Sequence, residues 1–173
     1  MAKQAYSRQN YIIDQRATAD IPYGRGTSDA SGCGWIALYN LMRCLGTPIS
    51  EAQAQEDLLC GSLFGGKLGT SPIHVCRALR HYGLQYRIRW QKKHLPEQMD
   101  GVTCGILLYR HKTGLHYVAF RREDAQQFEF WNAVLAKERH ITDMRSFLDR
   151  YTVGRLVMCM LLQTERRCQE VCL

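Results

Sequence analysis

Three residues of this sequence, Cys33, His116 and Asn132, have the side-chain chemistry needed for nucleophilic attack by a thiol. A histidine can take the proton of a cysteine thiol and later return it to a leaving group. An asparagine can hold that histidine by bonding the second ring nitrogen, which fixes the tautomer and the plane of the imidazole. The set has catalytic meaning only if the fold brings the three side chains together.

Cys33 directly follows a flexible stretch and begins an apolar helix. Residues 21–32 are rich in Gly, Ser, Thr and Asp, which is typical of a loop, whereas the apolar residues of 35–45 form one helical stripe. A helix N-terminus carries a positive field that favours thiolate, and the N–H of Cys33 could also reach a developing oxyanion. Gly32 and Gly34 leave room for a substrate backbone. On burial statistics alone, a structural role is commoner for such a cysteine.

His116 and Asn132 lie at corresponding ends of two expected strands. The stretches 116–120 and 127–131 are apolar, and the polar segment between them predicts a hairpin. In a hairpin, the start of the first strand and the end of the second lie side by side, so His116 and Asn132 are expected at the same end. Taken singly, each has an ordinary structural interpretation, as a hydrogen-bonded histidine or a turn-forming asparagine.

The remaining sequence predicts an α+β fold with helices first and an antiparallel β-sheet second. Ser50 is expected to cap a helix, and the glycine-rich stretch 61–71 is a loop that could form a wall of the cleft. A late helix over 141–151 is expected to begin near a Thr142 cap. The other expected elements are an edge strand at 11–13, helices at 35–45 and 72–82, and strands at 84–90, 102–109, 116–120, 127–131 and 156–162.

Length and composition favour one domain over residues 1–173, with a core of about 20–162. The eight cysteines show neither a disulfide framework nor the close ligand pairs of a zinc site, so no metal and no cofactor are expected. No apolar run approaches the roughly 20 residues of a membrane helix, and the N-terminus lacks a signal-like apolar core. These features predict a cytoplasmic location.

The formal charge of +7 is unevenly distributed. Residues 58–96 contain no acid and seven lysines or arginines, so one face of the molecule should be basic. A basic face could attract an acidic partner or nucleic acid. Because no nucleic-acid motif accompanies the charge, a solvated surface is the preferred interpretation, and nucleic acid is not expected as a partner.

The sequence resembles the double-glycine leader peptidases, the papain-like domains that mature bacteriocins, and their stand-alone bacterial relatives. The resemblance rests on Cys33-Gly34 opening a helix with Ala37 and Leu38, on the strand from His116, and on a polar residue 16 positions later. It covers roughly residues 20–135. It implies a papain-like fold, a cysteine peptidase activity, and a peptide or protein substrate.

Two positions depart from that family's pattern. The family usually has a glutamine six residues before the cysteine, where its side chain helps to form the oxyanion hole; here the residue is Thr27. Its place would be taken by Thr27, Ser28, Asp29 or the backbone N–H of Cys33. The third residue is usually Asp rather than Asn132. The residues expected to line the cleft are Gly32, Gly34, Trp35 and Trp131.

Three functional hypotheses follow. The leading one is a thiol hydrolase that cleaves a peptide or amide bond through an acyl-thioenzyme on Cys33. The second keeps the same cysteine and histidine in an acyltransferase or a cell-wall endopeptidase. The third is a catalytically weak or inactive peptide-binding module that has lost the oxyanion glutamine.

Overall fold

The computed structural model describes residues 7, 9–62, 69–133 and 140–163; most of the expected loop 61–71 therefore lies outside the described residues. The helices are α1 (Ser28–Ser31), α2 (Cys33–Cys44), α3 (Glu51–Leu59), α4 (Pro72–His81) and α5 (Met144–Tyr151), with 3-10 turns η1 (Gln15–Ala17), η2 (Lys92–His94) and η3 (Pro96–Gln98). The strands are β1 (Pro22–Tyr23), β2 (Gly26–Thr27), β3 (Arg87–Gln91), β4 (Cys104–His111), β5 (Gly114–Arg122), β6 (Phe128–Trp131), β7 (His140–Thr142) and β8 (Leu156–Leu162).

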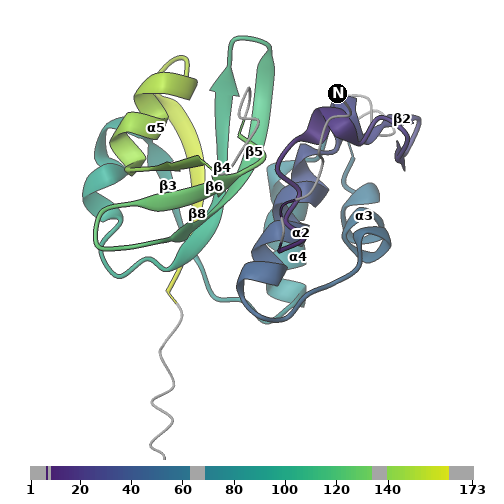
Figure 1. The fold of residues 1–173 in the computed structure, drawn as a ribbon, viewed down its shortest axis with the longest axis horizontal. Helices are drawn as coiled ribbons and strands as arrows, with labels where there is room; N and C mark the ends of the chain where they lie inside the picture. Colours follow the sequence, from purple (N-terminus) through teal and green to yellow (C-terminus); the bar gives the residue numbers. More distant parts are fainter. Residues whose placement is uncertain (1–6, 8, 63–68, 134–139, 164–173) are drawn as a thin grey trace, which may run out of the picture.

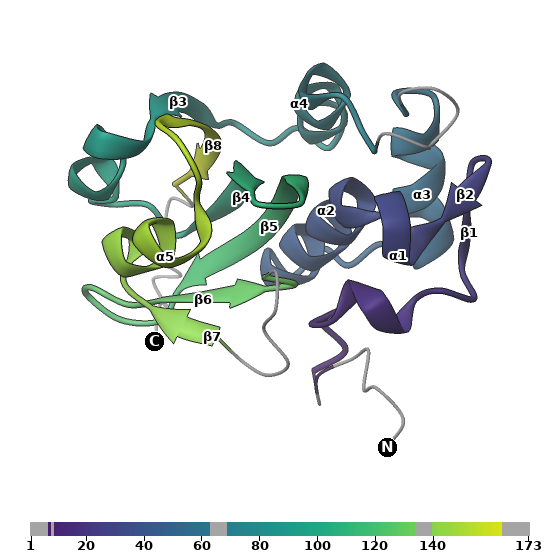
Figure 2. The same ribbon diagram turned by 90° about the horizontal axis from the view of Figure 1, so that it is seen from above.

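An antiparallel sheet with the strand order β3-β8-β4-β5-β6-β7 forms the C-terminal half. The helices α2, α3 and α4 lie on one side of it, and α5 lies on the other (Figures 1 and 2). This arrangement confirms the predicted α+β class, with helices before strands. Within the described ranges, no helix has the length and apolar character needed to cross a bilayer.

The central strands are buried on both faces, which explains why they are apolar without a gap. In β4, Ile106 and Leu108 belong to the core shared with the N-terminal helices, whereas Leu107 and Tyr109 belong to the core under α5. Successive side chains of a strand point to opposite faces, so a continuous apolar run supplies both cores at once. The sheet is thereby fixed between two layers, and β5 is held firmly beside α2.

The predicted hairpin is present, since β5 and β6 pair with Ala119 opposite Trp131. The late helix is shorter than expected. Residues 140–142 form β7 instead, and the helix begins at Met144 behind an Asp143 cap whose Oδ1 accepts from Ser146 N at 2.9 Å. The Thr142 cap is therefore wrong, because this residue pairs with β6 as part of the sheet.

The start of α2 requires glycine. Residues 28–31 form the short helix α1 rather than a loop, and Gly32 connects it to α2 in a helical conformation. A Cβ at Gly32 would lie 2.6 Å from both the carbonyl oxygen of Ser28 and the indole nitrogen of Trp35. That indole donates to Ser28 Oγ at 3.1 Å, which ties the two helices together. Cys33 is thus the first residue of a rigidly held α2.

Residues 11–16, called here the N-terminal strap, run between α2 and the end of β6. Residues 11–13 do not form the expected edge strand. The buried Asn40 of α2 holds Ile12 instead, with Oδ1 accepting from the Ile12 N–H and Nδ2 donating to the Ile12 carbonyl, both at 2.9 Å. Tyr11 stacks on Trp131 with ring centroids 4.2 Å apart. The strap therefore joins the helices to the sheet.

Replacing Asn40 with Leu should destabilise the fold strongly. The substitution would leave the buried N–H and carbonyl of Ile12 without partners, at about 1–3 kcal/mol for each group. Urea unfolding should show a loss of about 2–4 kcal/mol in the free energy of unfolding. As a control, Gln53→Leu on the exposed surface of α3 should change it by less than about 0.5 kcal/mol. Equal losses in the two variants would contradict the role given to Asn40.

Candidate active site

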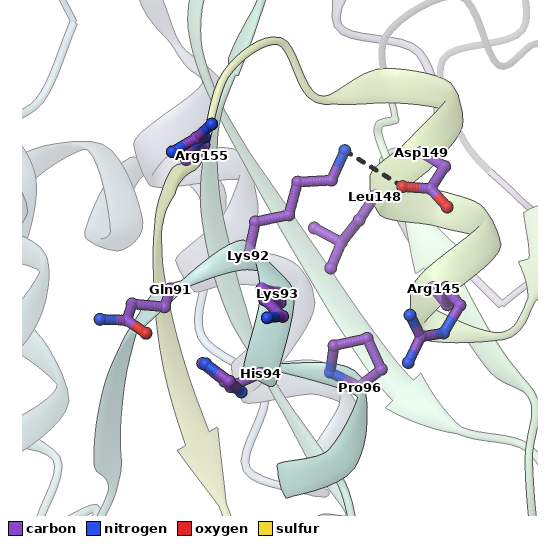
Figure 3. Close-up of a pocket in the computed structure, with 9 residues that line it drawn as sticks. All are labelled: Gln91, Lys92, Lys93, His94, Pro96, Arg145, Leu148, Asp149 and Arg155. Atoms are coloured by element: carbon purple, nitrogen blue, oxygen red, sulfur yellow. Dashed lines mark ion pairs between the residues drawn. The ribbon is translucent and has the colours of Figure 1, made fainter.

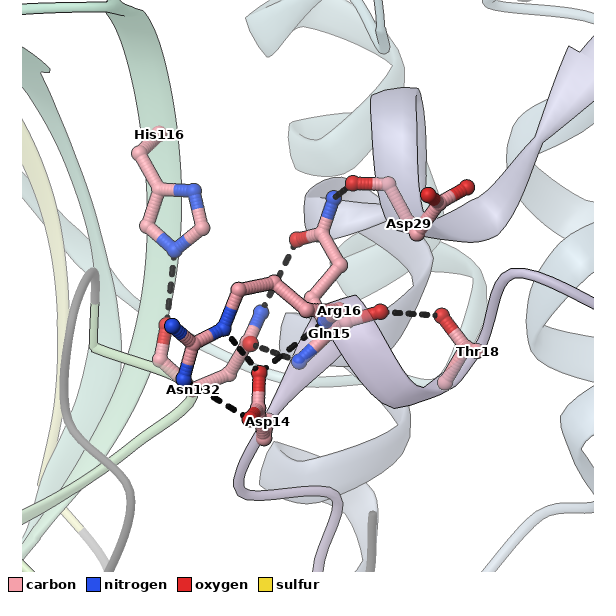
Figure 4. Close-up of polar contacts among 7 residues, drawn as sticks. All are labelled: Asp14, Gln15, Arg16, Thr18, Asp29, His116 and Asn132. Carbon is pink, nitrogen blue, oxygen red and sulfur yellow. Dashed lines mark hydrogen bonds and ion pairs between the residues drawn. The ribbon is translucent and has the colours of Figure 1, made fainter. Parts of the chain in front are cut away.

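The three predicted residues meet at one cavity of about 260 Å³ between the helices and the sheet. Its lining comes from four separate stretches of chain: residues 14–16 of the strap, residues 29, 30 and 33 around the start of α2, residues 113–116 at the start of β5, and residues 132–133 after β6. Cys33, His116 and Asn132 are all in this lining. Figure 4 shows the contacts among the polar residues of the site.

The thiol of Cys33 is almost enclosed, with 7% of the residue exposed. Burial raises the pKa of the Cys33 thiol, while the backbone N–H groups of Tyr117, Gly34 and Cys33 itself act in the opposite direction. Those N–H groups lie at the N-terminus of α2 and on the neighbouring β5, where they can stabilise negative charge on sulfur. The net effect of burial is a protonated thiol in the resting protein.

The tautomer of His116 follows from its hydrogen bond. Its Nε2 lies 2.6 Å from the backbone carbonyl oxygen of Asn132. A carbonyl can only accept, so Nε2 carries the proton, and in the neutral ring Nδ1 keeps a free lone pair. Figure 4 shows Nδ1 directed away from Asn132, toward the helical half of the molecule. The ring is thus prepared to accept a proton at Nδ1.

Burial also favours the neutral form of the base. Burial is the main reason why the pKa of His116 is lowered to about 4. The hydrogen bond to the Asn132 carbonyl raises this pKa, and the charge of His111 lowers it further. In the described residues, no hydrogen bond joins the thiol of Cys33 to the imidazole, although both line the same cavity. Catalytic hydrogen bonds are often long or poorly aligned before a substrate binds. At rest, the cavity thus holds a neutral thiol and a neutral imidazole.

Asn132 supports the site in a different way from the one expected. Its side chain was expected to bond the imidazole, but the backbone carbonyl does so, because Asn132 has a left-handed backbone with φ 65° as the chain leaves β6. The freed side chain faces the strap instead. Its Oδ1 accepts from the N–H of Gln15 at 2.8 Å, and its Nδ2 donates to Gln15 Oε1 at 3.2 Å.

Gln15 is a site residue that the sequence reasoning missed. It stands 18 positions before Cys33 and is 8% exposed, yet it lines the cavity. Its Nε2 donates to the carbonyl oxygen of Asp29 at 2.9 Å. The hairpin of β1 and β2 lies between Gln15 and Cys33, so a search at a fixed spacing could not find it. The available signal was a glutamine two positions after the apolar pair Ile12-Ile13.

A charge pair forms the rim of the strap. The carboxylate of Asp14 binds the guanidinium of Arg16 through two contacts of 2.7 and 2.8 Å. Asp14 is buried and Arg16 is exposed, and both line the cavity. Because the carboxylate compensates the guanidinium, the strap adds little net charge to the site.

The residues predicted as oxyanion-hole candidates differ in whether they reach the cavity. Asp29 lines the cavity, whereas Thr27 is exposed at the end of β2 and Ser28 is buried as the acceptor of the Trp35 indole. Gly34 lies against Thr70, whose hydroxyl group would be 2.7 Å from an added Cβ.

The prediction that Gly32, Gly34, Trp35 and Trp131 line the cleft is wrong, because all four are buried and none lines the cavity. Trp35 is fully buried, and Trp131 is 1% exposed beneath Tyr11. Gly32 lies between α1 and α2 as described above. These buried residues thus pack behind the residues that line the cavity.

Comparison with solved structures identifies the fold. A double glycine motif protease from the AMS/PCAT transporter, solved in complex with the leader peptide, matches with a TM-score of 0.51 and 17% identity over 76% of this chain and 84% of that one. The peptidase domain of Streptococcus ComA, a bi-functional ABC transporter involved in a quorum sensing pathway, matches with a TM-score of 0.52 and 17% identity over 76% and 91% of the two chains.

This chain has the papain-like peptidase fold. The predicted resemblance to double-glycine peptidase domains is confirmed at the level of structure. No protein-family model and no curated protein matches the sequence. At 17% identity the likeness establishes the fold, and the chemistry must be argued from the residues of this chain.

The imidazole of His116 should titrate near pH 4. Followed by NMR of the ring protons, its midpoint should lie well below the value near 6.5 that the same ring shows in the urea-unfolded chain. Since the folded-state pKa is the lower one, the unfolded chain binds the extra proton, and stability should fall as the pH decreases from about 6.5 to about 4. A folded-state midpoint above 6.5 would instead indicate a resting thiolate–imidazolium pair.

Proposed function

We propose that the protein is a cysteine hydrolase that cleaves a peptide or amide bond, with Cys33 as nucleophile and His116 as base. The observation that carries the proposal is the convergence of this thiol, this imidazole and Asn132 on one cavity, in a fold shared with peptidase domains. The substrate is expected to be a peptide or protein, because one of the proteases that share this fold was solved in complex with the leader peptide. The exposed Leu115 lines the cavity beside His116 and offers apolar surface to such a chain.

The first half-reaction would transfer an acyl group to sulfur. Since burial favours the neutral forms, His116 Nδ1 would remove the thiol proton as Sγ attacks the scissile carbonyl, rather than beforehand. The C–S bond forms while the carbonyl electrons move to oxygen. The resulting oxyanion then collapses, the C–N bond breaks, and the imidazolium returns its proton to the departing amine.

The second half-reaction would release the acyl group to water. His116 would take a proton from a water molecule, whose oxygen attacks the thioester carbon. As this second intermediate collapses, the C–S bond breaks and the imidazolium returns its proton to the departing sulfur, which regenerates the thiol and the neutral imidazole. Throughout, the Asn132 carbonyl holds Nε2–H, so only Nδ1 exchanges protons.

The oxyanion would be stabilised by the backbone N–H of Cys33 and by the amide of Gln15. The N–H groups at the start of α2 already point at the reacting sulfur. Gln15 Nε2 is a side-chain amide donor in the same lining, where the Asp29 carbonyl and Asn132 fix its amide plane. Gln15 would thus take the place of the glutamine that double-glycine peptidases usually have six residues before the cysteine.

A peptide vinyl sulfone library should label Cys33 selectively. The reagent needs a bound peptide and an adjacent base, so Cys33→Ala or His116→Ala should abolish the fast labelling at neutral pH. Because Cys60 is exposed and should react with simple alkylating agents, Cys60→Ala is the matched control and should leave the peptide-directed label in place. Mass spectrometry of the modified peptide gives the site. Undiminished labelling in the Cys33→Ala protein would refute the proposed nucleophile.

The Gln15→Ala variant should distinguish a role of Gln15 in stabilising the oxyanion from a role in holding the strap in place. Loss of one oxyanion donor should lower kcat/KM for a cleaved peptide amide by about 10²–10³. Labelling by the vinyl sulfone should stay near its original rate, because this reaction forms no tetrahedral oxyanion. Gln53→Ala, at an exposed glutamine of α3, should change neither rate. A parallel loss of both rates in Gln15→Ala would show that the residue only holds the strap in place.

A further inference from the structure

A second cavity of about 720 Å³ lies on the side of the sheet covered by α5, apart from the Cys33 site. It is formed where the connection from β3 to β4, containing η2 and η3, faces α5 and the start of β8. Figure 3 shows the side chains that surround it. Its volume is within the range of about 300–1,000 Å³ common for small-molecule sites. The two cavities have no lining residue in common, so this site is independent of the proposed hydrolase chemistry.

The lining of this cavity is strongly positive. Four cationic side chains surround it, from Lys92, Lys93, Arg145 and Arg155, against one carboxylate, Asp149. The excess is three positive charges, with the imidazole of His94 counted as neutral. Cations on facing walls of a concave site concentrate their field within it. The sequence predicts only a basic stretch; the fold brings part of it against Arg145 of α5 and Arg155, which directly precedes β8.

The charges of the cavity are only partly compensated within the protein. Lys92 Nζ lies 3.1 Å from Asp149 Oδ1, and Arg145 lies 3.8 Å from Glu97. The carboxylates of both pairs are more than half exposed, so water screens these contacts and an incoming anion can compete for the cations. In the described ranges, no carboxylate pairs with Lys93 or Arg155. These two cations can therefore meet an anion from outside.

The cavity also offers apolar and aromatic surface. Leu148 and Pro96 lie among the cations in Figure 3. An adjoining cavity of about 230 Å³ shares Gln91 and His94 with the first and is lined by Trp90, which is 56% exposed. An exposed indole can stack on a planar aromatic group. A ligand that combines several negative charges with an aromatic ring would use both surfaces.

We propose that this second cavity binds a nucleoside polyphosphate, with the phosphates among Lys92, Lys93, Arg145 and Arg155 and the base against Trp90. A compact ligand is favoured over a nucleic-acid strand because the cations converge on one hollow instead of following a groove along the surface. The ligand would connect α5 to the β3–β4 connection.

Titration with ATP and with tripolyphosphate tests this proposal. In about 0.1 M salt, where long-range attraction between exposed charges is largely screened, calorimetry should show saturable one-to-one binding of ATP. Tripolyphosphate should compete for the same site with lower affinity. Of the three tryptophans, Trp35 and Trp131 are buried, so ATP should quench the emission of Trp90. Trp90→Leu should weaken ATP binding and leave tripolyphosphate binding unchanged.

Charge-reversal variants identify the site. Arg155→Glu and Lys93→Glu should each weaken ATP binding at least tenfold. Arg77→Glu, at an exposed arginine of α4, makes the same change in net charge and should have little effect. Circular dichroism verifies that each variant is folded. If a charge-reversal variant does not fold, Arg155→Gln is measured in its place. The proposal is overturned if neither ligand saturates, if Arg77→Glu weakens binding equally, or if single-stranded RNA displaces ATP with much higher affinity.

Discussion

The hydrogen bond between His116 Nε2 and the carbonyl oxygen of Asn132 is the contact on which the site depends. A carbonyl has no proton to give, so this one contact decides which ring nitrogen is protonated and which is free. It exists because the backbone turns into the left-handed region at Asn132 immediately after β6. The end of a strand thus provides an orienting group that needs no charge, and asparagine is among the non-glycine residues that tolerate this conformation best.

The same turn explains how the strap becomes part of the site. Because the backbone of Asn132 serves the imidazole, its side-chain amide is available to hold Gln15. Asn40 fixes the other end of the strap to α2, and the stacked pair of Tyr11 and Trp131 joins strap and sheet between them. Each contact satisfies buried polar groups or buries a flat ring. Helices, strap and sheet are therefore positioned relative to one another by contacts that also define the cavity.

Much of this arrangement follows from local sequence patterns. The helical stripe after Cys33 and the hairpin between β5 and β6 could be predicted because apolar periodicity and turn residues act over short distances. The role of the Asn132 backbone could not, because residue type does not reveal a backbone angle. Gln15 was missed since its partner Asn132 is 117 positions away and a hairpin lies between it and Cys33. The start of α5 was misplaced because pairing with β6 recruits residues 140–142 into the sheet.

The separation of 117 positions between Gln15 and Asn132 also affects the order in which the site forms during folding. Closing so long a loop is entropically costly, and contacts of high sequence separation tend to form late in folding. The helix that carries Cys33 packs on β5, which lies far from it in the sequence, so thiol, base and strap reach their places only when these distant parts of the chain meet. Before that point a nascent chain has a cysteine without an oriented base, and it cannot yet cleave its neighbours.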